Sequence, residues 1–264
     1  MLRIALSAVA ILLFATAPNS HAVPTSPLHV QPFSLIGSAF VSGFRAGEAV
    51  MAFDINADSY SVRFNAESQG LIRLLFQWAF ELEVQGTLTA EHAAGLRPAV
   101  YQSRRYHRDG HVERHVRFRA GFAETVLPEG AEPYPHPVPP EERRQVLDPA
   151  SALLSAGLVL ARTGRCEQTI RVFDGKTRSN LVLTDRGDGP AAGSPASGRL
   201  SGDAKRCAFR SHRVAGYSDR HMRKPPVEGE IWFRAHVDGL MVPVRLQTPT
   251  RIGMAIFHFE PPAS

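Results

Sequence analysis

AVMAFDINADSYSVRFNAE, residues 49–67, contains two runs in which apolar and polar side chains alternate. Residues 49–55 place an apolar side chain at every second position, and residues 60–66 repeat the pattern after the turn-forming residues 56–58. Because successive side chains of a strand point to opposite faces, each run has one apolar face. The stretch predicts an antiparallel hairpin that covers a core on one side only.

The same alternation returns in residues 80–88 and again between residues 231 and 246. Asp-Gly pairs at 109–110, 174–175 and 238–239 predict further hairpins, because both residues tolerate positive φ in a two-residue turn. Pro243 has no N–H to donate to a neighbouring strand, so its strand is expected at an edge of the sheet or bulged there.

Two segments have helical character. Asp148-Pro149 is an N-cap and first-turn pair, and residues 150–161 are almost entirely apolar. A helix that is apolar nearly all round must be buried on most sides, so we expect it to pack across the concave face of the sheet. A short helix or buried turn is predicted at residues 70–78. The predicted fold class is mainly β: a single curved antiparallel meander sheet (open barrel or β-roll) with one buried helix near 149–161.

The first residues resemble a cleavable secretory signal. Arg3 precedes the apolar run 4–17, and Ser20-His21-Ala22 offers small side chains at a cleavage site. The apolar run is too short to span about 30 Å of hydrocarbon. We therefore expect a signal peptide at 1–22, no transmembrane segment in the mature chain, and a single β-rich periplasmic domain at 23–264.

The chain has two cysteines, Cys166 and Cys207. In an oxidising compartment such a pair is best interpreted as one disulfide. The alternative is two free buried thiols. A structural zinc site would need about four ligands, and no further metal-binding motif accompanies the cysteines.

His107, His111 and His115 are spaced by four residues around Asp109-Gly110. In the predicted hairpin Arg108 faces His111 and His107 faces Val112, so the histidines do not converge on a metal ion. Arginines on the same hairpin form a candidate anion-binding band, the alternative being a solvated polar face. Its members are Arg104, Arg108, Arg117 and Arg119.

The concave side of the sheet is a candidate binding cavity for an acyl chain. The alternative is that the same side chains fill a packed core. The candidate lining consists of Phe53, Phe64, Trp78, Phe80, Leu153, Leu154 and Phe233.

No catalytic signature is evident in the sequence. Residues 193–198 do not match a nucleophile elbow, and Glu81 and Glu83 alternate with core residues and should point to solvent. We expect no catalytic residue, no cofactor and no metal, and no nucleic-acid partner.

Several short motifs are similar to a known family: GFRAGEA at 43–49, SQGL at 68–71, Arg97-Pro98, LDPASALL at 147–154 and VFDGKTR at 172–178. On these motifs the chain resembles the exported bacterial domain-of-unknown-function 3108 family. The resemblance implies a periplasmic, β-rich protein with a curved sheet. It implies no established activity and therefore no catalytic residues to carry over.

The leading hypothesis is a non-enzymatic periplasmic cell-envelope protein that binds a lipid, lipoprotein or glycan ligand in a curved β-sheet. One alternative is a hydrolase of envelope polymers, which would need two convergent carboxylates or a histidine–carboxylate pair. The other is a structural protein that docks onto an envelope protein without a small ligand.

Overall fold

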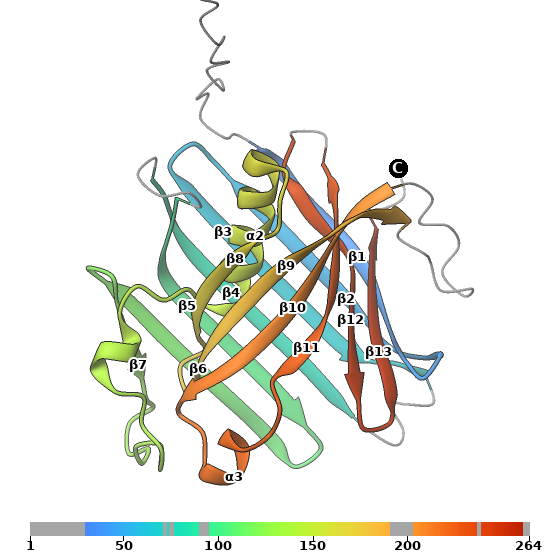
Figure 1. Ribbon diagram of the computed structural model, residues 1–264. Helices are drawn as coiled ribbons and strands as arrows, with labels where there is room; N and C mark the ends of the chain where they lie inside the picture. Colours follow the sequence, from blue (N-terminus) through green and yellow to red (C-terminus); the bar gives the residue numbers. More distant parts are fainter. Residues whose placement is uncertain are drawn as a thin grey trace, which may run out of the picture.

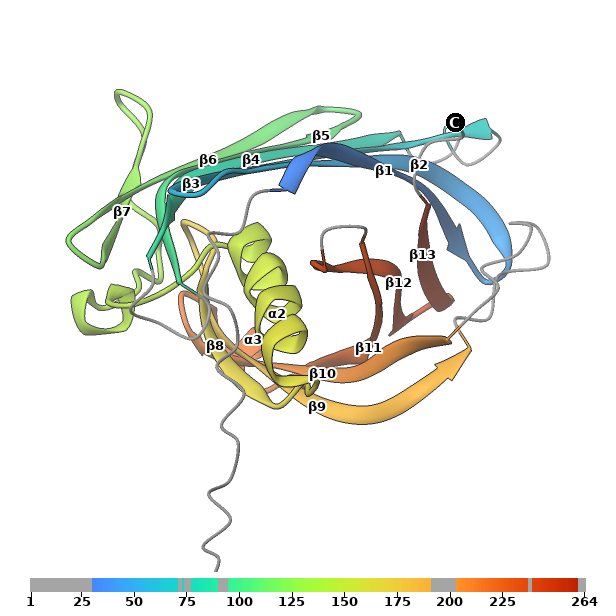
Figure 2. The same cartoon turned by 90° about the horizontal axis from the view of Figure 1, so that it is seen from above.

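The computed structural model of the protein describes residues 30–70, 73, 77–89, 95–190, 203–236 and 239–260. These residues form one 13-stranded antiparallel sheet that rolls up until it is nearly closed (Figure 1). Viewed from above, the sheet surrounds one long helix (Figure 2). The predicted fold class is confirmed. The predicted signal peptide and most of the predicted helix at 70–78 lie outside the described residues.

Seven strands make up the first part of the sheet: β1 (Val30–Val41), β2 (Phe44–Ile55), β3 (Ser59–Ser68), β4 (Trp78–Leu88), β5 (Leu96–His107), β6 (Gly110–Arg119) and β7 (Phe122–Val126). The 3-10 helix η1 (Pro140–Arg143) and the helix α2 (Pro149–Thr163) follow. The second part contains β8 (Gln168–Phe173), β9 (Arg178–Pro190), β10 (Asp203–Ala215), the short helix α3 (Asp219–Met222), β11 (Val227–Ala235), β12 (Met241–Thr250) and β13 (Gly253–Glu260).

The sheet consists of two meanders joined at one place. Its strand order is β7-β6-β5-β4-β3-β2-β1-β13-β12-β11-β10-β9-β8. Every neighbouring pair is consecutive along the chain except β1 and β13, which pair from Ile36 opposite Glu260 to Val41 opposite Ala255. The first meander therefore grows outward from β1, and the second returns from β8 to lie beside β1.

The alternation that opens the sequence is realised in β2 and β3. Met51 lies opposite Phe64 and Phe53 opposite Val62, on the face that lines the inside of the roll. Met51, Phe53 and Val62 are buried, whereas Arg63 on the other face is exposed. The predicted hairpin and its buried face are confirmed.

The helix α2 is capped at both ends, at its N-terminus by the residue that the sequence indicated. Asp148 Oδ1 accepts hydrogen bonds from the backbone N–H groups of Ala150 and Ser151, each at 2.9 Å. Gly164 ends the helix in the left-handed conformation with φ 68°. The helix contacts β12, β8, β4 and β5 inside the roll, as predicted (Figure 2).

Gly157 sets how closely α2 approaches β12. A Cβ atom at this position would lie 2.1 Å from the carbonyl oxygen of Met241. The helix therefore rests directly on the backbone of the neighbouring strand, and any side chain here would push the two apart.

Two hairpins differ from their predicted two-residue turns, and Asp238 of the third predicted pair lies outside the described residues. Between β8 and β9 the turn spans residues 174–177, since Phe173 pairs with Arg178.

The two turn residues between β5 and β6 are Arg108 and Asp109, so that His107 pairs with Gly110 and Tyr106 with His111. The predicted pairs Arg108 with His111 and His107 with Val112 are wrong: the turn lies one residue earlier, so each partner is two residues away from the predicted one. Gly110 pairs with His107 and so belongs to the strand rather than to the turn. Its φ of 146° is one that glycine adopts readily.

Pro243 lies in β12, a central strand between β11 and β13. The register shifts at this point, since Phe233 pairs with Pro243 but Trp232 pairs with Arg245. Val244 is the extra residue of a bulge. Of the two predicted explanations for this proline, the bulge is the one that the structure adopts.

We predict that Gly157→Ala destabilises the protein although alanine is the better helix former. Alanine gains about 1 kcal/mol of helix propensity, but overpacking a close backbone contact costs about 1–3 kcal/mol. Urea unfolding should therefore show a lower free energy of unfolding for Gly157→Ala. Ala161→Gly, at an exposed position of the same helix, measures the propensity effect alone. A more stable Gly157→Ala protein would contradict the close approach.

Candidate binding groove

The two outer strands of the roll, β7 and β8, do not pair with each other but are linked by residues 144–147, which we call the strap. Arg144 bridges to Phe122 of β7, and Leu147 bridges to Val172 of β8. Gln145 N–H donates to the carbonyl of Gly121 at 2.7 Å. The strap therefore closes the roll with backbone hydrogen bonds to both sides.

A second contact holds the same two sides together. In the β8–β9 turn, Asp174 Oδ1 accepts hydrogen bonds from the N–H groups of Lys176 and Thr177 at 3.0 and 2.7 Å. The other carboxylate oxygen of Asp174 forms an ion pair with Arg114 of β6. Thr125 of β7 donates to the carbonyl of Gly175 at 2.7 Å. The turn is thus rigid and docked onto the first meander.

A groove of about 1020 Å³ lies beside the strap. We call it the seam groove. It is formed by the ends of β4, β5 and β6, the β6–β7 turn and the strap. Its lining residues are Thr87, Gly95, Leu96, Arg97, Pro98, Ala99, Phe118, Ala120, Gly121, Arg144, Gln145, Val146 and Leu147.

The seam groove has an apolar floor and cationic residues in its lining. Leu96 and Val146 belong to the main hydrophobic core cluster, and Phe118 and Leu147 pack against that cluster. The arginines that line it are Arg97, which is exposed, and Arg144. The floor of the groove is therefore continuous with the hydrophobic core, and two guanidinium groups lie among the lining residues.

Local backbone features shape this groove. Gly86 pairs with Pro98 and Gln85 with Val100, so Ala99 is the extra residue of a bulge that bends β5. The β6–β7 turn has positive φ at both central residues, 47° at Ala120 and 73° at Gly121. This is the pattern of a type I′ turn. None of these residues carried a sequence signal for a binding site; Arg97-Pro98 is only one of the motifs of the family resemblance.

The predicted apolar lining lies in the packed interior. Phe53 and Leu154 are in the main core cluster, and Phe233 is fully buried in a second cluster beside α2. Phe64 packs against Phe80 with ring centroids 6.1 Å apart. Trp78 and Leu153 also pack against the main cluster. The structure thus places six of the seven residues in or against the core clusters, while Phe80 is half-buried against Phe64. The floor of the seam groove continues from the cluster that contains Phe53 and Leu154.

A hydrogen-bonded chain of polar groups is enclosed in the same interior. Ser151 Oγ donates to Asp148 Oδ2 at 2.5 Å, so the Tyr60 hydroxyl, 2.7 Å away, donates to Ser151. Burial raises the pKa of Asp148 to about 6, although its hydrogen bonds act in the opposite direction. Burial, together with the charge of Asp148, also raises the pKa of Tyr60. Asp148 and Ser151 are completely buried, so this chain holds the start of α2 rather than a substrate.

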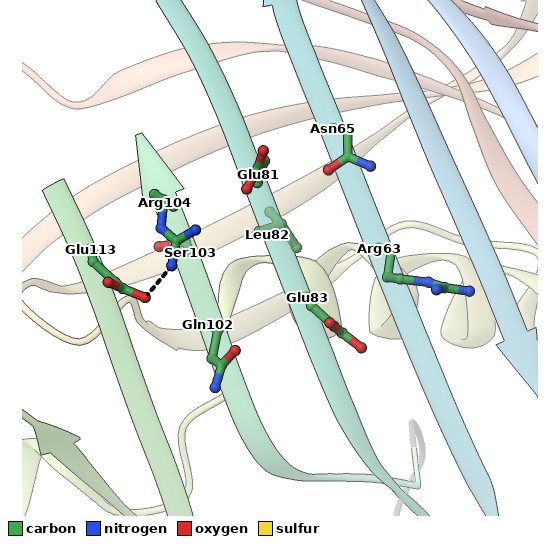
Figure 3. A pocket seen from close by; sticks show the side chains of 9 residues that line it. All are labelled: Arg63, Asn65, Glu81, Leu82, Glu83, Gln102, Ser103, Arg104 and Glu113. Carbon is green, nitrogen blue, oxygen red and sulfur yellow. Dashed lines mark hydrogen bonds and ion pairs between the residues drawn. The ribbon is translucent and has the colours of Figure 1, made fainter. Parts of the chain in front are cut away.

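The predicted arginine band lies on the outer face of β5 and β6, and the face assignment is confirmed by the pairing of Arg104 with Glu113. Figure 3 shows the polar residues around a shallow hollow of about 180 Å³ on this face. Arg104 forms an ion pair with Glu113 at 2.9 Å and pairs across the sheet with Glu81. Arg117 lies opposite Glu124.

Arg108 lies in the β5–β6 turn, and Arg119 lies opposite Phe122. The band therefore carries both signs of charge. An alternating pattern of this kind is typical of a solvated sheet face, whereas an anion-binding surface needs an excess of positive charge.

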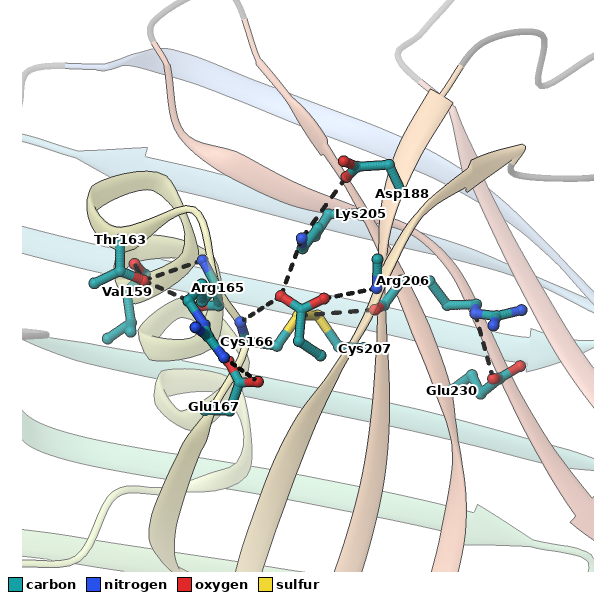
Figure 4. Close-up of a disulfide and its surroundings, with 12 residues drawn as sticks. Val159, Thr163, Arg165, Cys166, Glu167, Asp188, Lys205, Arg206, Cys207 and Glu230 are labelled. Atoms are coloured by element: carbon teal, nitrogen blue, oxygen red, sulfur yellow. Dashed lines mark hydrogen bonds and ion pairs between the residues drawn. A yellow bond between two sulfur atoms is a disulfide. The ribbon is translucent and has the colours of Figure 1, made fainter.

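Cys166 and Cys207 form the predicted disulfide (Figure 4). It connects the segment after α2 with β10, and both residues belong to the core cluster beside the helix. Asp185 accepts a hydrogen bond from Cys166 N–H at 3.4 Å and pairs with Lys205 Nζ at 3.0 Å. The C-terminal end of α2 is thus attached to the second meander.

A family model described as a protein of unknown function, DUF3108, matches residues 36–259. The chain belongs to this family. The match begins in the middle of β1 and ends one residue before the end of β13, so it includes β2 to β12, the strap and the seam groove. Among the curated proteins, none is similar enough to count as a match.

Two searches of the described residues give negative results for this DUF3108 chain. No group of three or more His, Cys, Asp or Glu side chains in the described ranges could hold a metal ion. Within the same part of the chain, no helix has the length and apolar character needed to cross a membrane.

We predict that Asp148 makes the stability of this DUF3108 protein fall as the pH rises from about 4 to about 6. The folded state binds the proton of this carboxyl more tightly than the unfolded state, because burial raises its pKa from 3.8 to about 6. A shift of this size corresponds to about 3 kcal/mol of unfolding free energy, lost as the pH passes through that window.

Asp148→Asn keeps an acceptor for the helix N-terminus but removes the charge, so it should abolish this pH dependence and be more stable than wild type at neutral pH. Asp148→Ala also removes the cap and should be about 1 kcal/mol less stable than Asp148→Asn at every pH. Denaturant unfolding over a pH series measures both. If the free energies of unfolding of wild type and Asp148→Asn change with pH in the same way, the carboxyl of Asp148 is not buried.

We predict equal effects for the two cysteine substitutions. Closing a loop of this length stabilises a fold by roughly 2–4 kcal/mol. Cys166→Ala, Cys207→Ala and the double variant should therefore lose a similar amount of unfolding free energy. Reductant should lower the stability of the wild type but leave the variants unchanged. A wild type that is indifferent to reductant would contradict a structural role for the disulfide.

Proposed function

We propose that this protein is a non-enzymatic binding protein of the cell envelope and that it holds an amphiphile, a lipid or the acyl chain of a lipoprotein, in the seam groove. The observation that carries the proposal is an open groove whose apolar floor is continuous with the hydrophobic core. Its volume of about 1020 Å³ is at the upper end of the range for small-molecule sites, about 300–1,000 Å³.

The composition of the groove suits a ligand with two chemically different parts. Leu96, Phe118, Val146 and Leu147 offer an apolar surface on which an alkyl chain gains about 0.8 kcal/mol for each buried methylene group. Arg97 and Arg144 can pair with an anionic headgroup, because a guanidinium matches the geometry of phosphate and carboxylate oxygens. A glycan would find few polar side chains along this floor.

The placement of the titratable groups supports binding rather than hydrolysis. The carboxylates of Glu81 and Glu113 lie on the outer face on either side of Arg104, which pairs with both strands. Asp148 is sealed inside the roll. His258 is buried against Phe40, and burial lowers its pKa to about 4, so it is neutral at physiological pH.

We predict that Ala99→Trp blocks the groove. Ala99 is exposed and lines the groove, so the larger side chain can occupy the space without disturbing the core. Losing the contacts of only two methylene groups would already weaken an alkyl ligand about tenfold. Native mass spectrometry and lipid extraction of protein purified from the periplasm should detect bound lipid in the wild type and much less in Ala99→Trp.

The matched control is Ala161→Trp, at an exposed position of α2 that is not part of the groove lining. It should retain the lipid content of the wild type. Arg97→Glu together with Arg144→Glu should lose anionic lipids selectively. A wild-type protein that is recovered empty, or equal lipid content in Ala99→Trp and Ala161→Trp, would overturn the proposal.

A further inference from the structure

The exposed large hydrophobic residues are concentrated at one end of the roll. In the described part of the chain, six of the eight lie where β1, β5, β10 and β12 lead into the next element: Phe44, Val112, Met222, Val227, Ile252 and Met254. This is the lower end in Figure 1, where α3 and the β12–β13 hairpin lie. Phe44 is 72% exposed and Ile252 is 73% exposed.

The most exposed of these residues lie on two neighbouring hairpins that support each other. The β1–β2 turn has positive φ at Ser42 and Gly43, the pattern of a tight type I′ turn. Ser42 N–H donates to the carbonyl of Met254 at 3.0 Å, and Ser42 Oγ donates to the carbonyl of Ile252. Phe44, Ile252 and Met254 therefore lie on the tips of two hairpins that are hydrogen-bonded to each other, and we call these three exposed apolar residues the tip patch.

The end of the roll that carries the tip patch has more exposed basic than acidic side chains. In the described residues of the connections at this end, the exposed acidic side chains are Asp109, Glu129, Glu132 and Asp219. The exposed basic ones are more numerous: Arg73, Arg108, Arg220, Arg223, Lys224 and Arg251. Apolar side chains that protrude among an excess of cations are suited to the interface of a bilayer with anionic lipids.

We propose that this end of the protein docks onto the surface of an anionic lipid bilayer, with Phe44 and Ile252 inserted among the lipids and the arginines and lysines of the same end at the headgroups. A second copy of the chain is a poorer partner, because a symmetric dimer would bring the same basic surface together on both subunits. The inference goes beyond the proposed function and stands without it.

The test measures binding of the purified protein to sedimenting vesicles of phosphatidylethanolamine and phosphatidylglycerol in equal parts. Vesicles of phosphatidylcholine alone provide the uncharged comparison. The wild type should bind the anionic vesicles, and added salt should weaken the binding because it screens the charges. Phe44→Ser combined with Ile252→Ser should weaken binding roughly tenfold or more, since two large side chains no longer leave water.

A matched control exists on the outer face of the sheet. Ile36 and Val50 form a cross-strand pair and are 51% and 42% exposed. Ile36→Ser combined with Val50→Ser removes similar apolar surface away from the tips and should bind like the wild type. Arg251→Glu should weaken binding to the anionic vesicles only.

A wild type that does not bind the anionic vesicles would overturn the inference, as would equal losses in the tip and control variants. A tip variant that changes the sedimentation coefficient of the protein without lipid would point to self-association and would also overturn it. Ala99→Trp should bind vesicles normally. Vesicle binding by this variant therefore tests the docking surface independently of the seam groove.

Discussion

The pairing of β1 with β13 is the interaction on which the rest of the structure depends. Among the described residues, it is the one place where the two meanders exchange main-chain hydrogen bonds as neighbouring strands, and it joins residues more than 200 positions apart in the sequence. Without it, each meander would expose an unpaired edge and an uncovered apolar face. Bringing residues so far apart in the sequence together costs conformational entropy before their contacts can stabilise the fold. We therefore expect this pairing to form late in folding.

The strap closes the other side of the roll, and the helix α2 fills its interior. A sheet that curls around on itself still has two edges, here β7 and β8, and its interior must be filled. The chain between these edges supplies both parts: residues 144–147 bond to each edge, and α2 fills the interior. Asp148 links the two, since it caps the helix directly after the strap. The seam groove lies beside the place where this closure is made by a short segment rather than by paired strands.

Local sequence patterns predicted the elements that are determined by residues close together in the sequence. Alternation located the β2–β3 hairpin, and the cap and apolar run located α2. The tight turns at Ser42-Gly43 and Ala120-Gly121 escaped prediction because neither carries the Asn-Gly or Asp-Gly signal, although both adopt positive φ at two successive residues. The seam groove escaped for another reason. Phe118 and Val146 come from different elements, and only the closure of the roll makes them neighbours, so no spacing in the sequence could indicate it.

The position of β13 in the middle of the sheet has a consequence for biosynthesis. During translation or passage through a membrane, every strand from β1 to β12 is present before the partner that unites them. Until β13 is made, the sheet cannot close. We therefore expect chaperones that hold unfolded chains to bind the incomplete protein. A transcript cut short before β13 would yield a product with exposed strand edges, which cellular proteases would be expected to remove.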